Sequence, residues 1–489
     1  AVSARATWTG NGAGEVGGAM QIGAESVKLT PASWQGGKLA LVAPVAASLA
    51  VQVDDGAGKP SPFRLNAWPT ETAMLGERVF LNTTGSAVWK LPAGRWDVWL
   101  HHGPERGSYA TTVDLVAGET TSLTASLPVA VTTTGWVACD MHIHSEHSAD
   151  SGAPISQRMR GAVVEGLDYV VATDHDFVTD YTPWLDEVGL SDRLTVRSGV
   201  EVSTALIGHF NVWPVAVDPT RSGNGAPAWY GKEAVDLIAM LRGPANERIV
   251  QCNHARDGTS YFDRIELDAT TIEPAWVGFD AIELLNGVRM SSFDLVRADW
   301  ATLMARGIRL VATGTSDSHS VPSAIGGART YVWLGSDKDG QPRDVQGRFA
   351  PADVETALRA GRAFATSGPI LLIQASNGGT QASIGDTLTA VSGVVKVHAS
   401  VHTPAWVKLG TLELWLGDAK IASADVSAVP AVGGQITASL QATLPGGADG
   451  FVYAVLRPGT ASSKPGLAHE AQAVTNPVFI DGDGDGKWH

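Results

Sequence analysis

The chain has 489 residues, of which 44% are hydrophobic and 17% are charged. This composition is typical of a folded globular protein and excludes an intrinsically disordered one. The formal net charge is -15, and no run of Lys or Arg could neutralise a nucleic-acid backbone, which argues against binding to DNA or RNA polymers. The sequence has no apolar stretch of about 18 or more residues, the length that a membrane-spanning helix needs.

The first part of the chain, residues 1–135, is predicted to be all β. Short runs of alternating apolar and polar residues, such as 94–100 and 121–127, are separated by Gly, Pro, Asn and Asp, which is typical of strands and turns. No long helical pattern interrupts them, so we expect one or two β-sandwich-like modules. Because the chain begins with Ala1 rather than Met, we also expect a mature form without its signal peptide, periplasmic or secreted.

Residues 136–375 change to apolar strands that alternate with helical stretches. This alternation is typical of βαβ units around a largely parallel sheet, and a barrel-like closure follows if successive strands are neighbours. After this region the chain returns to Gly-rich alternation, which predicts a C-terminal β-sandwich over residues 376–489. In the central region we expect strands at 136–141, 169–173, 194–200, 209–212, 248–253, 279–285 and 309–314, and helices at 155–167, 232–241 and 293–306.

Side chains that bind metals stand at the carboxyl ends of these predicted strands, where barrel enzymes place their catalytic groups. Residues two apart in a strand point to the same face, so His142 and His144 can present two imidazoles to one ion. Asp317 and His319 repeat this spacing. One such histidine alone would more simply be a surface or hydrogen-bonded core residue, but the set favours a metal centre. The predicted ligands are His142, His144, Asp150, His175, Glu201, His209, His254, Asp317 and His319.

The chemistry of these side chains narrows the choice of metal. Imidazole nitrogen with carboxylate oxygen and no thiolate suits Zn, Mn, Fe or Ni, and a carboxylate such as Glu201 can bridge two ions. The two cysteines, Cys139 and Cys252, lie inside apolar runs and are too few for a thiolate zinc site or a disulfide framework. We expect both to be buried thiols.

The central region resembles a polymerase-and-histidinol-phosphatase (PHP) domain of the amidohydrolase-related superfamily. The opening His-x-His of that family is similar to residues 140–144, its Thr-Asp-His to 173–175, its Gly-x-Glu to 199–201 and its closing Asp-x-His to 317–319. The remaining ligand positions of the family match Asp150, His209 and His254. The resemblance covers about half of the chain.

This resemblance implies a distorted seven-stranded β/α barrel, flanked by the two β regions, that holds two or three divalent ions (Zn, Mn or Fe). Two flanking segments, residues 102–105 and 475–477, resemble parts of the secreted CehA/McbA-like branch of the family. The first departs from the branch pattern, because His102 and Arg106 stand where Arg and Tyr are usual. The ligands implied are His142, His144, Glu201 and Asp317 for one ion, Asp150, His175 and His319 for a second, and Glu201, His209 and His254 for a third.

The resemblance favours a metal-dependent hydrolase, most simply a phosphoesterase that acts on a phosphate monoester or diester. Divalent ions lower the pKa of bound water to about 7, so a hydroxide that bridges two ions can act as the nucleophile. Asp317 and Glu201 are the predicted catalytic side chains. The same centre could serve a carbamate or amide hydrolase, and a β-rich binding protein with a vestigial barrel is the non-enzymatic alternative.

The expected partner is a small phosphate-bearing molecule rather than a nucleic-acid polymer or a membrane. Guanidinium groups bind phosphate bidentately, so we predict that Arg256, Arg289 and Arg329 contact the substrate, together with Asn286 at a strand end. A structural ion pair is the alternative for each arginine. The loop 218–231 either covers the mouth of the site or packs as a surface loop. The tail 481–486 matches half of a calcium loop, but we favour a solvated turn.

Overall fold

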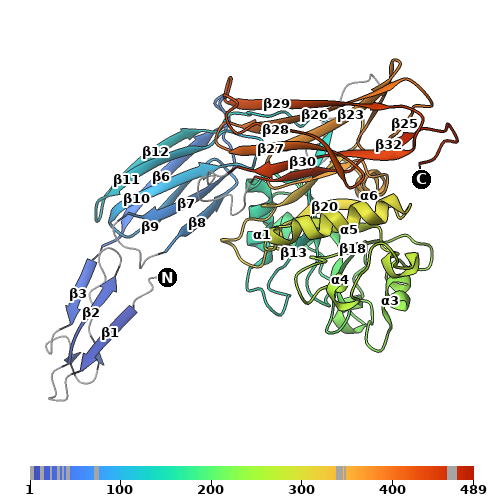
Figure 1. The fold of residues 1–489 in the computed structure, drawn as a ribbon. Coiled ribbons are helices and arrows are strands. Elements are labelled where there is room, and N and C mark those ends of the chain that lie inside the picture. The colour runs from blue at the N-terminus through green and yellow to red at the C-terminus, as the bar shows by residue number, and fades with distance from the viewer. Residues whose placement is uncertain are drawn as a thin grey trace. The chain divides into compact units, whose positions relative to one another are not determined.

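The computed structural model describes residues 45–70, 76–336, 345, 349–459 and 471–488 with their side chains, and the backbone of short strands between Arg5 and Leu39. The chain divides into two compact units (Figure 1). The smaller unit is Ala1–His102 with Ser108–Pro128, and the larger unit is Gly103–Gly107 with Val129–His489. Among the described residues, no helix has the length and apolar character needed to cross a membrane.

The described core of the smaller unit lies between two β-sheets. Alternate residues of the strands, among them Leu49, Phe63 and Trp96, point inward and form one buried cluster, as the period of two in a half-buried strand requires. One sheet has the order β11-β10-β7-β8, with β7 Phe63–Pro69, β8 Arg78–Asn82, β10 Gly94–His101 and β11 Tyr109–Leu115. The other has the order β12-β6-β9, with β6 Ala47–Asp54, β9 Ser86–Leu91 and β12 Thr120–Ser126. A separate sheet is formed by β1 Arg5–Gly10, β2 Val16–Ile22 and β3 Glu25–Leu29, and a hairpin by β4 Trp34–Gln35 and β5 Lys38–Leu39.

Two runs of strands in the larger unit carry the predicted ligands. In the first, β13 Trp136–Ile143, β14 Tyr169–Ala172 and β15 Thr195–Ser198 are parallel neighbours. In the second, the order is β16-β17-β18-β19-β20. Parallel bridges between Ile143 and Ser318, and between His175 and Glu201, connect the ends of one run to the other. The second run comprises β16 Val200–Thr204, β17 Gly208–Trp213, β18 Ile249–Cys252, β19 Ala281–Asn286 and β20 Val311–Thr315.

The strand predicted over residues 194–200 is in fact two strands. It ends at Ser198, and β16 begins at Val200 in the other sheet. Gly199 lies at the break, where a Cβ atom would be 2.7 Å from Val171 Cγ1 and 2.8 Å from the Val212 carbonyl oxygen. A short turn joins β16 to β17, so these two strands pair antiparallel. Strands β17 and β18 are antiparallel as well. The predicted largely parallel sheet is therefore mixed, and the described fold is a sheet-rich α/β fold.

The three predicted helices are present, with ends that differ by up to three residues from those expected. In α5 Phe293–Ala305, the residues Phe293, Val296, Trp300 and Met304 are buried, at the spacing of one helical face. Arg297 of the same helix lies over the Trp415 ring at 4.0 Å and donates to Tyr453 Oη at 2.8 Å. The other helices are α1 Ile155–Val164, α2 Thr182–Glu187, α3 Ala234–Leu241, α4 Tyr261–Arg264 and α6 Pro351–Arg359, with 3-10 turns η2 Ser222–Gly225, η3 Pro274–Val277 and η4 Met290–Ser292.

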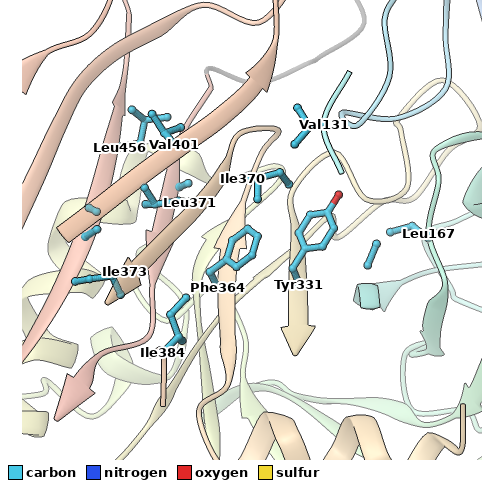
Figure 2. Close-up of a cluster of buried hydrophobic side chains, with 14 of the residues drawn as sticks. Val131, Leu167, Tyr331, Phe364, Ile370, Leu371, Ile373, Ile384, Val401 and Leu456 are labelled. Atoms are coloured by element: carbon cyan, nitrogen blue, oxygen red, sulfur yellow. The ribbon is translucent and has the colours of Figure 1, made fainter. Parts of the chain in front are cut away.

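The C-terminal part of the chain shares a sheet and a core with the central part. Strand β13 pairs on its other side with β21, and the sheet then continues through β22, β31, β30, β27 and β28. A second sheet, β24-β23-β26-β29, packs against it through one apolar cluster, in which the rings of Tyr331 and Phe364 stack at 5.0 Å (Figure 2). The predicted boundary between residues 375 and 376 falls inside β23 Ile370–Asn377.

These strands are β21 Arg329–Trp333, β22 Ala363–Thr366, β24 Thr380–Ser383, β25 Thr387–Thr389, β26 Val394–Pro404, β27 Leu409–Leu416, β28 Ala419–Asp425, β29 Gln435–Pro445, β30 Gly450–Pro458, β31 Ala473–Thr475 and β32 Val478–Asp481. The tail predicted as a turn begins in β32, where the carboxylate of Asp481 accepts the N–H groups of Gly484 and Gly486 at 2.7 and 3.2 Å.

The two segments that resemble the secreted branch make structural contacts within the larger unit. The side chain of Asn476 accepts the Ala312 N–H at 2.8 Å and donates to the carbonyl oxygens of Ala312 and Ala363, each at 2.9 Å. Glu105 accepts the Tyr331 hydroxyl at 2.8 Å, and burial raises the pKa of its carboxyl group. Asn476 thus ties β20 to β22, and Glu105 anchors its loop on β21.

Gly103 offers a test of how tightly that loop is held. Its φ is 67°, and a Cβ atom would lie 2.3 Å from the Glu165 carbonyl oxygen. We expect Gly103→Ala to lower the free energy of unfolding by about 3 kcal/mol, through left-handed backbone strain and overpacking. Gly189 is the matched control, because its φ is 69° and nothing lies within 4 Å of its Cβ position. Gly189→Ala should cost only about 1 kcal/mol. Equal losses in denaturant unfolding would contradict the tight contact.

Candidate metal centre

The structure brings all nine predicted ligands to one end of the strands. His142 lies on β13, Glu201 on β16 and His209 on β17. The others follow strands or lie in the loop before α1. The rings form a continuous group, with centroids 5.1 Å apart for His142 and His144, 4.0 Å for His144 and His319, and 5.2 Å for His209 and His254. Side chains up to 177 residues apart in the sequence therefore meet in one place.

Glu201 lies at the middle of this group and is only 1% exposed. Its Oε1 is 3.3 Å from His142 Nε2, and its Oε2 is 3.3 Å from His144 Nε2 and 3.0 Å from His175 Nδ1. Asn253 Nδ2 donates to Oε1 at 2.8 Å. Burial would raise the pKa of Glu201, but the surrounding imidazoles, His142 foremost, hold it well below its ordinary value. Glu201 is therefore an anion within 3.5 Å of the rings of five histidines.

At this centre, three sets of ligand atoms lie within 4.8 Å of one another. His144 belongs to two of them, and His175 lies with Glu201 as well as with Asp150. The ion-by-ion assignment implied by the family resemblance divides these residues differently, and it stays a prediction. His254 belongs to none of these sets, although its Nε2 is 3.5 Å from Glu201 Oε1. The sets are His144, Asp150, His175 and His319; His142, His144 and Asp317; and His175, Glu201 and His209.

The second ring nitrogen of several histidines is held by a hydrogen bond, which fixes the direction of the first. His142 Nδ1 lies 2.6 Å from Glu283 Oε1, and His144 Nδ1 lies 2.9 Å from Ser148 Oγ. The corresponding partners are Ser260 Oγ for His254 and the Asp317 carbonyl oxygen for His319, each at 2.8 Å. Metal-binding histidines are oriented in this way, with Nδ1 engaged and Nε2 directed at the ion.

Three buried atoms at the middle of the group have no hydrogen-bond partner among the described residues: His142 Nε2, His144 Nε2 and Glu201 Oε2. Buried polar atoms normally have partners, so atoms without one call for an explanation such as an ion. Burial lowers the pKa of His144 to about 4, so its imidazole is neutral at pH 7 with a lone pair to donate. Imidazole nitrogens and carboxylate oxygens in this arrangement fit divalent ions.

The centre has a buried side and an open side. The side chains of His142 and His144 are 0% exposed, whereas Asp150 is 52% exposed, His209 32% and His319 30%. The centre is therefore accessible from the side of Asp150, His209 and His319.

Left-handed backbone conformations gather at the strand ends that form the centre. His254 has φ 30°, and Asp176 and Asp317 each have φ 50°. Such conformations cost about 1–3 kcal/mol each for residues other than Gly and persist where the surrounding structure holds them. Each N–H here has a firm acceptor: Glu283 Oε2 for His254 at 2.7 Å, the Glu201 carbonyl oxygen for Asp176 at 2.8 Å and the His142 carbonyl oxygen for Asp317 at 2.9 Å.

Two of the predicted substrate arginines are engaged in structural contacts. Arg256 donates to Asp299 at 2.8 Å, to Asp263 at 3.1 Å and to the Leu267 carbonyl oxygen at 3.1 Å. Arg329 is 2% exposed and donates to the carbonyl oxygens of Gly326 and Glu165. The interpretation of both as substrate contacts is corrected, because nearness in sequence to a ligand does not set the direction of a side chain.

The other two predicted substrate residues lie beside the centre. Asn286 is 3% exposed, and its Nδ2 is 3.2 Å from Asp317 Oδ2. Arg289 donates to Asp257 Oδ2 at 2.6 Å, and that oxygen is 3.5 Å from His254 Nδ1. The Arg289 side chain is 38% exposed, so its guanidinium is open to an incoming anion. Their contact with a substrate stays a prediction.

The loop 218–231 reaches the centre through Trp229, whose Nε1 donates to Asp176 Oδ1 at 2.9 Å. The next residue, Tyr230, is 90% exposed. The Ser203 hydroxyl, which we did not predict to be part of the centre, forms a hydrogen bond of 2.5 Å with His175 Nδ1. Glu283 was also missed as a partner of the centre. Its acidic side chain within the apolar run of β19 was the signal in the sequence that could have indicated it.

No protein-family model and no curated protein sequence matches this chain. Among solved structures, it is similar to a two-domain protein containing a predicted PHP-like metal-dependent phosphoesterase from Bacteroides vulgatus, with 15% identity, 71% of this chain and 96% of that chain covered, and a TM-score of 0.36. It is also similar to a candidate metal-dependent phosphoesterase from Bifidobacterium adolescentis, with 15% identity, 43% and 94% covered, and a TM-score of 0.27. With TM-scores this low, neither likeness identifies the family or the function of this chain.

Substitution of Glu201 tests the centre directly. We expect the wild-type protein to hold at least two divalent ions per chain, and Glu201→Gln to hold fewer than one, because an amide nitrogen cannot ligate a metal and the central negative charge is lost. Elemental analysis after dialysis gives the count. His398→Gln, on β26 outside the centre, is the control and should leave the count unchanged. A wild-type count below two would contradict a multinuclear centre.

Proposed function

We propose that this chain is a metal-dependent hydrolase, and more closely a phosphoesterase. The observation that carries the proposal is the convergence of His142 Nε2, His144 Nε2 and Glu201 Oε2, buried and without hydrogen-bond partners among the described residues. Six further side chains with ligand chemistry surround them, each contacting another member of the group. A set of this size exceeds what one ion needs and suits a site for two or three ions.

A closed PHP-type barrel is part of this proposal. The strands β13, β14 and β16 to β20 would form a ring of seven, and the bridges from Ile143 to Ser318 and from His175 to Glu201 support its closure at both junctions. Such a ring explains why ligands from β13, β16, β17 and the ends of β14, β18 and β20 share one mouth. We retain the CehA/McbA-like branch and a periplasmic or secreted location as proposals alongside it.

Bound divalent ions would lower the pKa of water, polarise a phosphoryl oxygen and stabilise the leaving oxygen. The chain's own groups have separate tasks. Glu201 would hold the ions through its central negative charge. Asp317 is 4% exposed, and nearby His142 holds the pKa of its carboxyl group well below the usual value against the effect of burial. It is therefore a carboxylate at neutral pH, the form that can ligate an ion and accept a hydrogen bond from the reacting groups.

Substrate recognition falls to the open side of the centre. The net charge of -15 repels anions at long range, so a phosphate-bearing small molecule needs local positive charge. Arg289 provides it, because its guanidinium is 38% exposed and joins the centre through Asp257 and His254. The exposed Asp150, His209 and His319 border the same opening.

Removal of the metals tests the reaction class. We expect turnover of nitrophenyl phosphate or bis-nitrophenyl phosphate that is lost after dialysis against a chelator and restored by Zn²⁺ or Mn²⁺, because the ions supply the activated water. A naphthyl carbamate is assayed in parallel. Activity on the carbamate alone would replace the phosphoesterase proposal by the carbamate or amide hydrolase. An absence of chelator-sensitive turnover on every substrate would support the binding-protein alternative.

Substitution of Arg289 tests recognition of the anion. We expect Arg289→Ala to raise KM for the phosphate ester about tenfold or more with a smaller change in kcat, since a hydrogen bond to a charged group contributes about 1.5–3 kcal/mol. Arg362, which pairs with Asp386 at 3.3 Å, is the control, and Arg362→Ala should leave KM unchanged. An unaltered KM for Arg289→Ala would show that another group holds the phosphate.

A further inference from the structure

Glu283 is a buried acid at the centre of β19 that belongs to none of the predicted ligands. All six residues of this strand are buried, and the Glu283 side chain is 0% exposed. We propose that Glu283 is a positioning residue that holds three ligands of the metal centre in their binding geometry. The inference rests on the proposed metal centre. It adds a residue that the binding of more than one ion would depend on.

The carboxylate of Glu283 is surrounded by hydrogen-bond donors. Its Oε1 lies 2.6 Å from His142 Nδ1, 2.6 Å from Thr315 Oγ1 and 3.1 Å from Gln251 Nε2. Its Oε2 accepts from the His254 N–H at 2.7 Å and from Asn286 Nδ2 at 3.0 Å. A carboxylate accepts only, so the proton of the His142 ring must lie on Nδ1. The Nε2 atom is thereby directed at Glu201 and the centre.

The second ligand that Glu283 positions is His254. This residue has φ 30°, a left-handed conformation that is unfavourable for a residue with a Cβ atom. The bond from its N–H to Glu283 Oε2 stabilises that conformation. The turn brings His254 Nε2 to 3.5 Å from Glu201 Oε1, so the carboxylate acts here through the main chain.

The third ligand is Asp317, which Glu283 reaches through Asn286. The Asn286 amide nitrogen donates to Glu283 Oε2 at 3.0 Å and to Asp317 Oδ2 at 3.2 Å. Strand β19 lies between β18 and β20 in the sheet, and β20 leads to the segment that bridges to the end of β13. One carboxylate therefore connects ligands delivered by three strands.

Glutamine has nearly the shape of glutamate, but it cannot replace Glu283. Five donors face the two oxygens, and an amide would turn its own NH₂ group toward two or three of them. Glu283→Gln therefore keeps the volume of the side chain and removes the positioning. Glu413 is the matched control, because it is 5% exposed, lies on β27 outside the centre, and accepts from Trp415, Lys420 and Arg457 at 3.0 to 3.1 Å.

The experiment measures metal affinity rather than turnover. Metal-free wild type, Glu283→Gln and Glu413→Gln are equilibrated with buffered Zn²⁺ at graded free concentrations, and bound ions per chain are counted by elemental analysis. We expect Glu283→Gln to raise the half-saturating Zn²⁺ concentration about 10–100-fold, the usual effect of losing such a partner. Glu413→Gln should leave it unchanged even where denaturant unfolding shows a loss of stability. The Co²⁺ absorption spectrum should change only in Glu283→Gln.

Each outcome of this experiment supports or overturns the positioning role of Glu283. If Glu283→Gln folds and binds Zn²⁺ as the wild type does, the positioning role is wrong while the proposed metal centre stands. Equal shifts in the Glu283 and Glu413 variants would also overturn it, since the effect would then come from general stability. A wild type that binds no ion overturns the metal centre and the inference together. If Glu283→Gln does not fold, Asn286→Ala removes the link from Glu283 to Asp317 and should raise the half-saturating concentration about tenfold; an unchanged value would overturn the inference.

Discussion

The larger unit is organised around one electrostatic constraint, the burial of a carboxylate among imidazoles. Glu201 is 1% exposed and stands 3.0 to 3.3 Å from nitrogens of His142, His144 and His175. Polar atoms are costly to bury without partners, so the surrounding structure must supply either hydrogen bonds or an ion. It supplies hydrogen bonds to Nδ1 of His142 and His144. Their Nε2 atoms and Glu201 Oε2 face one another without such partners among the described residues. The strand ends, with their left-handed residues, converge to make this arrangement possible.

The sequence predicted which side chains would come together because strand geometry is local. The spacing of two in His142 and His144 places both rings on one face, and the structure has both turned to Glu201. The helices were predicted for the same reason, since a helical face repeats within a few residues. The direction of Arg256 depends instead on Asp263 and Asp299, which α4 and α5 bring to it. No local pattern carries that information, and the same holds for the five partners of Glu283.

Boundaries were harder to predict than elements. The break at Gly199 is set by the approach of Val171 and Val212, which are distant in sequence. The local pattern of residues 194–200 therefore gave no sign of two strands. The boundary expected after residue 375 lies within β23 because Ile370, Leu371 and Ile373 pack into a core that Leu167 and Tyr331 also enter (Figure 2). The alternating pattern there predicts the strands of a new sheet correctly. It does not show that this sheet shares a hydrophobic core with the central region.

The C-terminal sheets support the strands that carry the predicted ligands. Strand β13 lies between β14 and β21, and Asn476 fastens β20 to β22. Strands β13 and β20 lead to His142, His144 and Asp317, so these buried side chains rest on strands embedded in a large close-packed core. Asp150 and His209, by contrast, come from a loop and a hairpin on the exposed side. Rigid support on one side and access on the other is the division that the proposed metal centre needs, because ion positions must be fixed while a substrate enters and leaves.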